Sequence, residues 1–453
     1  MIEWEFCCEI DKRMSLYYNN VNIIFKEGFM DINQTITVKI IDTNENGVGI
    51  AKHDGMVVFV PGVITGEVAE IRITGSEKNF SYGECVNRIS DSEHRIDDPC
   101  PSAALCGGCT LGFVTYEFEN LIKQNTVKAA LRRAGLDYSL VCDTVAADTA
   151  CGYRNKIAVH YDSDKKIFGY KKEKSSEVID FRGCLLCSTE MNRVIEWTNE
   201  HIDMIECLSP KSLNVRSSVV GITVSLYAEE DHGDYFEAYK TAVLDELGQI
   251  ENVILISDKT AQNRTYIKDR IFGLDMNFTS ETFRQVNADA FELLLTIVHE
   301  FAAEKPFRRC ADLYCGSGII GLSLANRFPE SHFWGIEINE DAIEDAKKNA
   351  ARNCINNIRF FSGDAASFKK RISEDRYPEL IVVDPPRAGL SKEMRKDLKL
   401  LSPERIIYVS CNPQTMARDA AELCTAGYHL VKAVPVNMFP RTKHCETVAY
   451  LTK

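Results

Sequence analysis

The sequence predicts an α/β protein whose C-terminal part is a Rossmann-like, doubly wound sheet, preceded by a small OB-like β-barrel and an α+β segment. Strand-like and helix-like segments alternate from about residue 279 onward, as in a parallel sheet covered by helices. A G-x-G-x-x-G loop follows the first strand of that series. Short β-branched runs separated by glycines occupy the N-terminal part, and a chain of 453 residues is too long for one core.

The composition is that of a globular protein, with 45% hydrophobic and 26% charged residues. No apolar run approaches the roughly 20 residues that span a bilayer, so we expect no membrane partner. The first residues are acidic and unlike a secretory signal, which favours a cytoplasmic location. Residues 1–30 precede the first clear strand and are expected to be an N-terminal extension.

The net charge of −13 argues against nonspecific capture of nucleic acid by the chain as a whole. Local basic segments are still compatible with RNA binding. The segment from Lys165 to Arg182 has two interpretations, a solvated hairpin face or a contact with RNA phosphates.

Residues 31–92 are expected to form the barrel. The runs I-T-V-K-I, G-M-V-V-F-V, E-V-A-E-I-R-I and Y-G-E-C-V-N-R-I lie between glycines, a pattern typical of a small closed barrel. Together with G-V-G-I-A and V-F-V-P-G, the segment resembles a TRAM domain, an OB-like barrel. That resemblance implies RNA binding; the alternative is another small barrel with a different partner.

Residues 93–278 are expected to form an α+β central domain, with helices near 116–134, 189–205 and 233–246. It contains three closely spaced cysteines in a C-x5-C-x2-C pattern, Cys100, Cys106 and Cys109. Without a secretory signal, such spacing favours a metal or cluster site over disulfides. Both a cubane iron–sulfur cluster and zinc accept four thiolates. The candidates for the fourth ligand are Cys142, Cys151, Cys184 and Cys187, and we favour Cys184 because a strand-like run and Gly183 precede it.

Residues 279–453 are expected to form the Rossmann-like domain. A helical pattern runs from Thr282 to about Ala303, and Phe283 at its start either stacks on a base or caps the helix. Strands are then expected at residues 309–313, 333–338, 358–362, 379–383, 405–410, 430–436 and 447–452.

Four of these strands end in a polar residue, and parallel strands place their carboxyl ends at one edge, where ligands bind. The four residues are Glu337, Asp364, Asp384 and Cys411. The glycine loop adds Gly316 and Gly318, which permit close backbone approach, and Tyr314 and Ile319, which supply apolar contacts. Glu337 is suited to bind ribose hydroxyls, and Asp364 is suited to accept from an adenine amino group.

The glycine loop alone fits NAD, FAD or S-adenosylmethionine equally well. A dehydrogenase needs a proton donor near a nicotinamide but no thiol after the fifth strand. An adenosyl group together with a methyl acceptor explains the whole set of residues better. Cys411 is then a candidate nucleophile, although most free cysteines are simply small buried residues.

Several motifs resemble the RNA uridine-5-methyltransferase family, in particular its 23S ribosomal RNA enzymes of the RumA/RlmD type. The motifs are D-L-Y-C-G-S-G, D-P-P-R-A-G-L, Y-V-S-C-N-P, M-F-P-R-T-K-H-C-E-T-V, F-R-Q-V-N and the C-x5-C-x2-C cysteines. The resemblance implies a class I methyltransferase domain, S-adenosylmethionine, and a [4Fe-4S] cluster on Cys100, Cys106, Cys109 and Cys184. Since the family's transfer-RNA branch generally lacks both barrel and cluster, it also implies 23S ribosomal RNA as the substrate.

The resemblance also implies roles for individual residues. Cys411 is the nucleophile that adds to uracil C6, Glu446 is the base that removes the C5 proton, and Gln285 and Asp384 lie at the cofactor and target-base site. Cys445 is expected to face away from Glu446 by strand alternation and to serve packing. Cys315 is expected to be structural too.

Two other functions are compatible with parts of the sequence. A small-molecule dehydrogenase or methyltransferase leaves the barrel and the cysteine motif without a purpose. A non-catalytic RNA-binding protein predicts damage to the nucleophile or base motif, and both motifs are intact. Nothing in the sequence requires more than a monomer.

Overall fold

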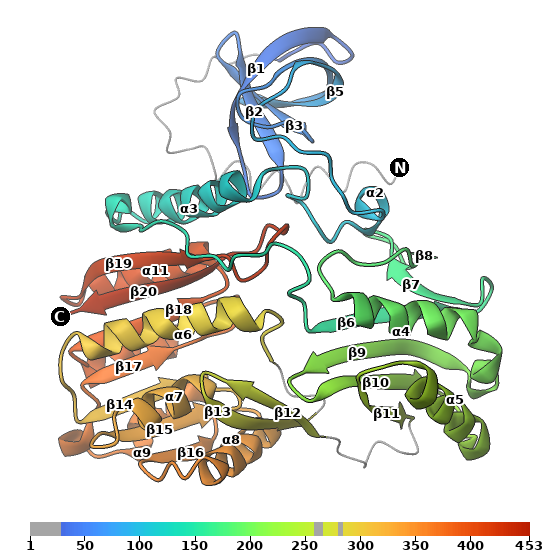
Figure 1. The fold of residues 1–453 in the computed structure, drawn as a ribbon. Coiled ribbons are helices and arrows are strands. Elements are labelled where there is room, and N and C mark those ends of the chain that lie inside the picture. Colours follow the sequence, from blue (N-terminus) through green and yellow to red (C-terminus); the bar gives the residue numbers. More distant parts are fainter. Residues whose placement is uncertain (1–28, 258–265, 280–283) are drawn as a thin grey trace.

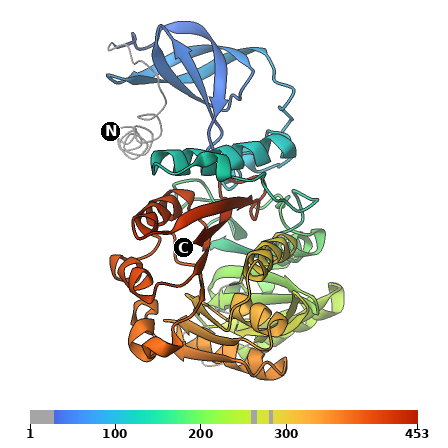
Figure 2. The same ribbon diagram turned by 90° about the vertical axis from the view of Figure 1, so that its left-hand side faces the viewer.

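The structure, a computed structural model, describes residues 29–257, 266–279 and 284–453. Three bodies are visible in Figure 1: a barrel at the top, a central sheet in green, and a large sheet in yellow to red. Figure 2 shows helix α3 (Tyr116–Arg133) lying between the barrel and the large sheet. No helix of the described residues is long and apolar enough to cross a membrane.

The N-terminal body is a closed barrel of five strands in the order β1-β2-β3-β5-β4, which confirms the predicted barrel. The strands are β1 (Thr35–Thr43), β2 (Val48–His53), β3 (Met56–Pro61), β4 (Val68–Ser76) and β5 (Phe80–Ser90). Alternate residues of β1, such as Val38 and Ile40, point into the barrel core. Closure pairs every strand on both sides, so no open edge is left for unwanted pairing.

The central sheet has six strands in the order β11-β10-β9-β6-β7-β8. They are β6 (Lys156–Asp162), β7 (Ile167–Lys171), β8 (Val178–Asp180), β9 (Pro210–Ser218), β10 (Gly221–Ala228) and β11 (Ile250–Ile256), with helices α4 (Thr189–Glu200) and α5 (Gly233–Glu246) packed on them. The predicted helix ending near residue 205 is shorter, because α4 stops at Glu200. His201 leaves the helical conformation, and its ring Nδ1 lies 2.9 Å from the Trp197 carbonyl oxygen at the helix end.

The large sheet has seven strands in the order β16-β15-β14-β17-β18-β20-β19 and confirms the predicted Rossmann-like domain. Five neighbouring strands are parallel, and β20 is antiparallel to both of its neighbours. The strands are β14 (Arg309–Leu313), β15 (His332–Glu337), β16 (Ile358–Ser362), β17 (Leu380–Val383), β18 (Arg405–Ser410), β19 (His429–Val436) and β20 (Glu446–Thr452). Each agrees with a predicted strand to within one residue.

Helices cover both faces of this sheet and bury two hydrophobic cores. One face carries α6 (Ala288–Ala303), α7 (Ile319–Arg327) and α8 (Glu340–Arg352). The other carries α3, α10 (Lys392–Leu401) and α11 (Pro413–Cys424). Because β14 lies between β15 and β17, the chain changes direction across the sheet at β14, which opens a crevice at its carboxyl end.

The helix predicted from Thr282 begins later, at Ala288. Asn287 caps it, since its side-chain oxygen accepts from the Ala290 N–H at 3.1 Å. Just before it, the Arg284 guanidinium binds Asp269 at 2.7 Å, which ties this stretch to neighbouring segments instead of the helix. Thr282 and Phe283 lie outside the described residues, so the two roles considered for Phe283 stay predictions.

Two segments from the range 93–278 pack against the large sheet. Helix α3 contacts α11 and β19. The hairpin of β12 (Tyr266–Ile271) and β13 (Leu274–Thr279) packs on α8, where the Thr279 N–H donates to Asp345 at 2.9 Å. The Rossmann-like domain therefore draws part of its cover from residues earlier in the chain.

Candidate active site

The glycine loop after β14 has the conformation that its residues predict. Gly316 and Gly318 have φ of 52° and 82°, in the left-handed region that favours glycine. A Cβ on Gly318 would lie 2.7 Å from the Phe360 ring, whereas nothing lies within 4 Å of one on Gly316. The loop is therefore tightly packed on one side and has free space beside Gly316.

Glu337 ends β15 directly beside this loop. Its carboxylate accepts from the Gly316 N–H at 3.2 Å and from the Asn339 N–H at 2.9 Å. A carboxylate has about four lone-pair sites, so two are left for hydroxyl groups of a ligand. Ile319, buried at 7% exposure, begins α7 next to the loop.

The other predicted cofactor residues lie around the same edge of the sheet. Asp364 is exposed after β16, and its carboxylate accepts from the Ala366 N–H at 2.9 Å. Burial, then the charge of Glu337, raises the pKa of Asp384 to about 7. Tyr314 is half-buried, and burial followed by the charge of Asp364 raises its pKa to about 12.

Gln285 carries an unsatisfied polar atom. Its side-chain oxygen is buried and accepts no hydrogen bond from the described residues, although its backbone carbonyl accepts from Asn155 at 3.0 Å. A buried acceptor without a donor is costly, by about 1–3 kcal/mol. A ligand that donates a hydrogen bond to this atom removes that cost.

Cys411 and Glu446 come from neighbouring strands of the sheet. Ser410 of β18 pairs with Thr447 of β20, so continuing this antiparallel register by one residue places Cys411 opposite Glu446. Cys411 follows the buried end of β18 and is half-buried. Glu446 begins β20 and is 3% exposed.

Burial and the charge of Asp384 raise the pKa of both groups, and Glu446 also raises the pKa of Cys411. Burial, then the charges of Glu446 and Asp384, raises the pKa of Cys411 to about 11. Burial, then the charge of Asp384, raises the pKa of Glu446 to about 8. The positive charge of Arg387 lowers the pKa of both groups. Without a ligand, the pair therefore favours its protonated forms at neutral pH.

The two other cysteines near the site serve packing, as predicted. Cys445 is 3% exposed in the core beneath α10 and α11, and its thiol donates to the Glu446 carbonyl at 3.2 Å. Cys315 is buried in the opposite core, and burial raises the pKa of its thiol.

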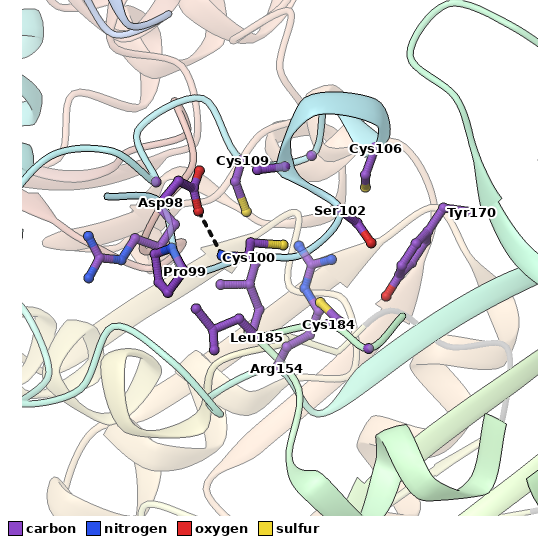
Figure 3. Close-up of a pocket in the computed structure, with 16 residues that line it drawn as sticks. Asp98, Pro99, Cys100, Ser102, Cys106, Cys109, Arg154, Tyr170, Cys184 and Leu185 are labelled. Atoms are coloured by element: carbon purple, nitrogen blue, oxygen red, sulfur yellow. Dashed lines mark hydrogen bonds between the residues drawn. The ribbon is translucent and has the colours of Figure 1, made fainter. Parts of the chain in front are cut away.

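A second site lies between the barrel and the central sheet. A cavity there is lined by Cys100, Cys106, Cys109 and Cys184, which come from two segments of the chain (Figure 3). Helix α2 (Ala103–Cys106) carries Cys106, and the Asp98 carboxylate accepts from the Cys100 N–H at 3.0 Å (Figure 3).

The alternative fourth cysteines do not line this cavity. Cys142 and Cys151 are absent from its wall, and Cys187 is buried behind Cys184. A hydrogen bond from the Cys187 thiol is the main cause that lowers the pKa of Cys184 to about 5.

The cavity opposes the ionisation of three of the four cysteine thiols that line it. Among the described residues, no three His, Cys, Asp or Glu side chains are close enough together to hold a metal ion. Burial, then the neighbouring thiols, raises the pKa of Cys109 to about 12, so thiolates here need a positive partner. The cavity wall also includes Arg154 and Ser102, whose Nε and Oγ atoms are buried without hydrogen-bond partners among the described residues. Four thiols are the donor set that either a cubane cluster or zinc would take.

Comparison with known proteins agrees with this architecture. A model of the tRNA (uracil-5-)-methyltransferase family matches residues 247–453, and a TRAM domain model matches residues 31–86. An RNA methyltransferase of Halalkalibacterium halodurans, itself uncharacterised, is 30% identical over 92% of this chain and 97% of its own length. The chain belongs to the RNA uracil-5-methyltransferase family. As a member, it is an enzyme that acts on RNA with S-adenosylmethionine as methyl donor, and its barrel is a TRAM domain.

Two further relatives support the membership. An uncharacterised RNA methyltransferase of Caldanaerobacter subterraneus is 32% identical over 93% of this chain and 99% of its own length. The crystal structure of a tRNA (uracil-54, C5)-methyltransferase from Pyrococcus abyssi, bound to S-adenosyl-L-homocysteine, is 25% identical and superposes with a TM-score of 0.70. That alignment covers 92% of this chain and the whole of the other chain.

Several residues of the two sites were not predicted from the sequence. Arg387 lies in the quoted D-P-P-R motif, which is the signal that could have identified it beside Cys411. Arg154 and Tyr170 line the cysteine cavity, yet no spacing or motif relates them to the cysteines.

Proposed function

We propose that this chain methylates C5 of a specific uridine in 23S ribosomal RNA, with Cys411 as nucleophile and Glu446 as base. The observation that carries the proposal is the strand register, which by extension from the Ser410–Thr447 pair sets Cys411 opposite Glu446. A thiol and a carboxyl group that act on adjacent carbons of one base need this proximity. Asp384 relates this pair to the glycine loop, because its charge acts on both groups and the charge of Glu337 acts on it.

Cys411 makes C5 of the target base nucleophilic. Uracil C5 is a poor nucleophile, so the thiolate adds to C6, an S–C6 bond forms, and the C5–C6 double-bond electrons become an enolate across C4 and C5. The target base must first leave its stack to reach a half-buried thiol. Arg387 favours the thiolate, because it lowers the pKa that burial and Glu446 raise.

Glu446 completes the reaction. After C5 has gained the methyl group it still carries a hydrogen, which the Glu446 carboxylate removes as a proton. The C–H electrons re-form the C5–C6 double bond, and the S–C6 bond breaks to release the Cys411 thiolate. Because its pKa is about 8, this carboxyl group is a stronger base than an exposed glutamate.

The crevice fits the methyl donor, which supplies an electrophilic methyl group when bound. The glycine loop with Tyr314, Gly316, Gly318 and Ile319 lies beside free space, and Glu337 has acceptor sites for ribose hydroxyls. Asp364 is exposed at the neighbouring strand end and is assigned to the adenine amino group. Asp384 and the unsatisfied oxygen of Gln285 are assigned to the donor and the target base.

The cysteine cavity is proposed to hold a [4Fe-4S] cluster through Cys100, Cys106, Cys109 and Cys184. Zinc needs four sulfurs at about 2.3 Å from one point. A cubane binds one thiolate on each of four irons, and the cavity offers four cysteines. Since methyl transfer is redox-neutral, the group is assigned a structural role in the central domain and in RNA contact.

The choice of 23S ribosomal RNA rests on the cysteine motif alone; the barrel does not discriminate, because the alignment with the Pyrococcus abyssi structure named for a tRNA reaction is too long to leave the barrel out. Transfer RNA is the second candidate, because the Pyrococcus abyssi structure named for a tRNA reaction aligns over 92% of this chain. We further propose that the enzyme works as a monomer in the cytoplasm.

Mass spectrometry of nucleosides from 23S and transfer RNA, with the gene intact and deleted, tests the proposal. We expect 5-methyluridine to disappear from one 23S fragment, which also locates the uridine. Loss from transfer RNA alone keeps the chemistry and replaces the substrate. No change in either RNA, in a strain without a second enzyme for the same uridine, contradicts the proposal.

A further inference from the structure

A buried ion pair on α3 lies outside the proposed site. Glu119 and Lys123 are one helical turn apart, their charged atoms are 2.8 Å apart, and neither side chain is exposed. Such a pair is weak evidence for stability, because well-packed apolar residues often serve equally well. Both side chains face residues 437–442, which follow β19 and are called the β19–β20 loop below.

Both charged groups form hydrogen bonds with this loop. The Lys123 ammonium donates to the Asn437 side-chain oxygen and to the Phe439 carbonyl at 3.0 Å. With Glu119 it has three partners, as many as its protons. The Glu119 carboxylate accepts from the Arg441 N–H at 3.0 Å and from the Asn437 side-chain amide at 2.9 Å.

Other segments fix the remaining carbonyl groups of the loop. Four consecutive backbone carbonyls each accept a hydrogen bond from a distant part of the chain. These are Met438 from Asn287 at 3.1 Å, Phe439 from Lys123 at 3.0 Å, Pro440 from Tyr153 at 3.0 Å, and Arg441 from Leu111 at 3.0 Å. The loop is thus held by hydrogen bonds from four distant segments of the chain.

The loop connects the two sites of the molecule. On one side the Arg441 side chain lines the cysteine cavity, and its guanidinium donates to the Val114 carbonyl at 2.7 Å. On the other side the chain continues through His444 into Glu446, the first residue of β20. Because Glu446 pairs with Val436 at the end of β19, the loop begins and ends beside it, and a displacement of the loop acts on Glu446 more directly than on Cys411, which follows β18.

We propose that Glu119 and Lys123 are positioning residues for the proton removal by Glu446, acting through the β19–β20 loop. The inference rests on the proposed function of Glu446. Loss of the pair then slows release of the RNA from Cys411 far more than it slows methyl transfer, since only the later step uses the base. A displacement of about 1 Å can cost as much as about a hundredfold in rate.

The test variant is the double substitution Glu119→Leu with Lys123→Met, which leaves no unpaired buried charge. Lys128→Met, on the same helix, is the matched control. Anaerobically purified holoenzyme is mixed with methyl-labelled S-adenosylmethionine and total RNA from cells that lack the gene. Label in the denaturant-resistant protein–RNA adduct reports methyl transfer, and label in free RNA reports release.

For the double variant we expect methyl transfer within about threefold of wild type, and release slowed at least about tenfold, so that labelled adduct accumulates. Lys128→Met keeps both rates. Release and methyl transfer that fall by the same factor, or that both keep the wild-type rate, overturn the inference. If circular dichroism shows that the double variant does not fold, Asn437→Ala, which removes the side chain that both Glu119 and Lys123 contact, is judged by the same ratio.

Glu446→Gln in the same assay separates the two proposals. If it accumulates labelled adduct and the folded test variant does not, only the positioning inference is wrong. If it releases methylated RNA at the wild-type rate, the base assignment is wrong and the positioning inference falls with it.

Discussion

Cys411 lies opposite Glu446 across two antiparallel strands, one residue beyond the Ser410–Thr447 pair. We expect Cys411→Ala to abolish both turnover and covalent adducts with RNA that contains 5-fluorouridine. The physical reason is that alanine offers no electron pair to C6. Gel electrophoresis under denaturing conditions measures the adduct, and Cys207→Ala, an exposed cysteine, is the control. Turnover that survives the change removes Cys411 from the mechanism.

Replacing the proposed base gives a different result from replacing the nucleophile. Glu446→Gln keeps the size and polarity of the side chain but cannot accept the C5 proton. We expect methylated RNA to remain bound to Cys411, with release slowed by about 10²–10⁴-fold. The matched control is Glu393→Gln on the exposed first turn of α10. Normal release of methylated RNA contradicts the role of Glu446.

The release step is expected to speed up with pH. Since the pKa of Glu446 is about 8, the fraction of ionised Glu446 rises about tenfold for each pH unit below 8 and levels off above it. The rate of single-turnover release, measured between pH 6 and 9 after adduct formation, should show this rise directly. Glu446→Asp keeps a titratable group, so its release rate should still rise with pH. A flat profile in wild type contradicts the assignment.

Stability is expected to change with pH through Asp384. Its folded pKa of about 7 is above its ordinary value of 3.8, so the protein binds this proton more tightly when folded. The resulting stability is present below about pH 4 and is lost as pH rises through about 7. Asp384→Asn should therefore raise the free energy of unfolding at pH 8, by on the order of 1–3 kcal/mol, but not at low pH.

Thermal unfolding at pH 5 and pH 8, without ligands, measures this difference. Asp231→Asn, in an exposed loop, is the control and should leave the two midpoints unchanged relative to wild type. An Asp384→Asn variant that is equally destabilised at both pH values would show that the carboxyl group is structurally required instead.

The cysteine cavity predicts metal content. Anaerobically purified protein should contain about four irons and four sulfides per chain and absorb visible light. Cys184→Ser should lose most of this iron, whereas Cys151→Ser should keep it, because Cys151 does not line the cavity. Stoichiometric zinc without iron in the wild-type protein contradicts the cluster.

The strands of the Rossmann-like domain could be predicted because each is a short apolar run with clear boundaries. The start of α6 could not. The pattern predicts a helix from Thr282, but the Arg284 side chain binds Asp269, and the helix begins six residues later, at Ala288, after the cap Asn287. The periodicity of a sequence does not include such contacts between distant side chains.

The sequence by itself determined the fold class, the barrel, the glycine loop, and the motifs that contain Cys411 and Glu446, because these depend on local patterns of residues. The sequence favoured Cys184 among four candidate cysteines, and only the tertiary structure brought it into one cavity with the first three, where Cys187 is absent from the wall. It also decided that Lys123 contacts Asn437, 314 residues away. A buried charge looks like any other charged residue in the sequence, and its partners are fixed by how the chain packs.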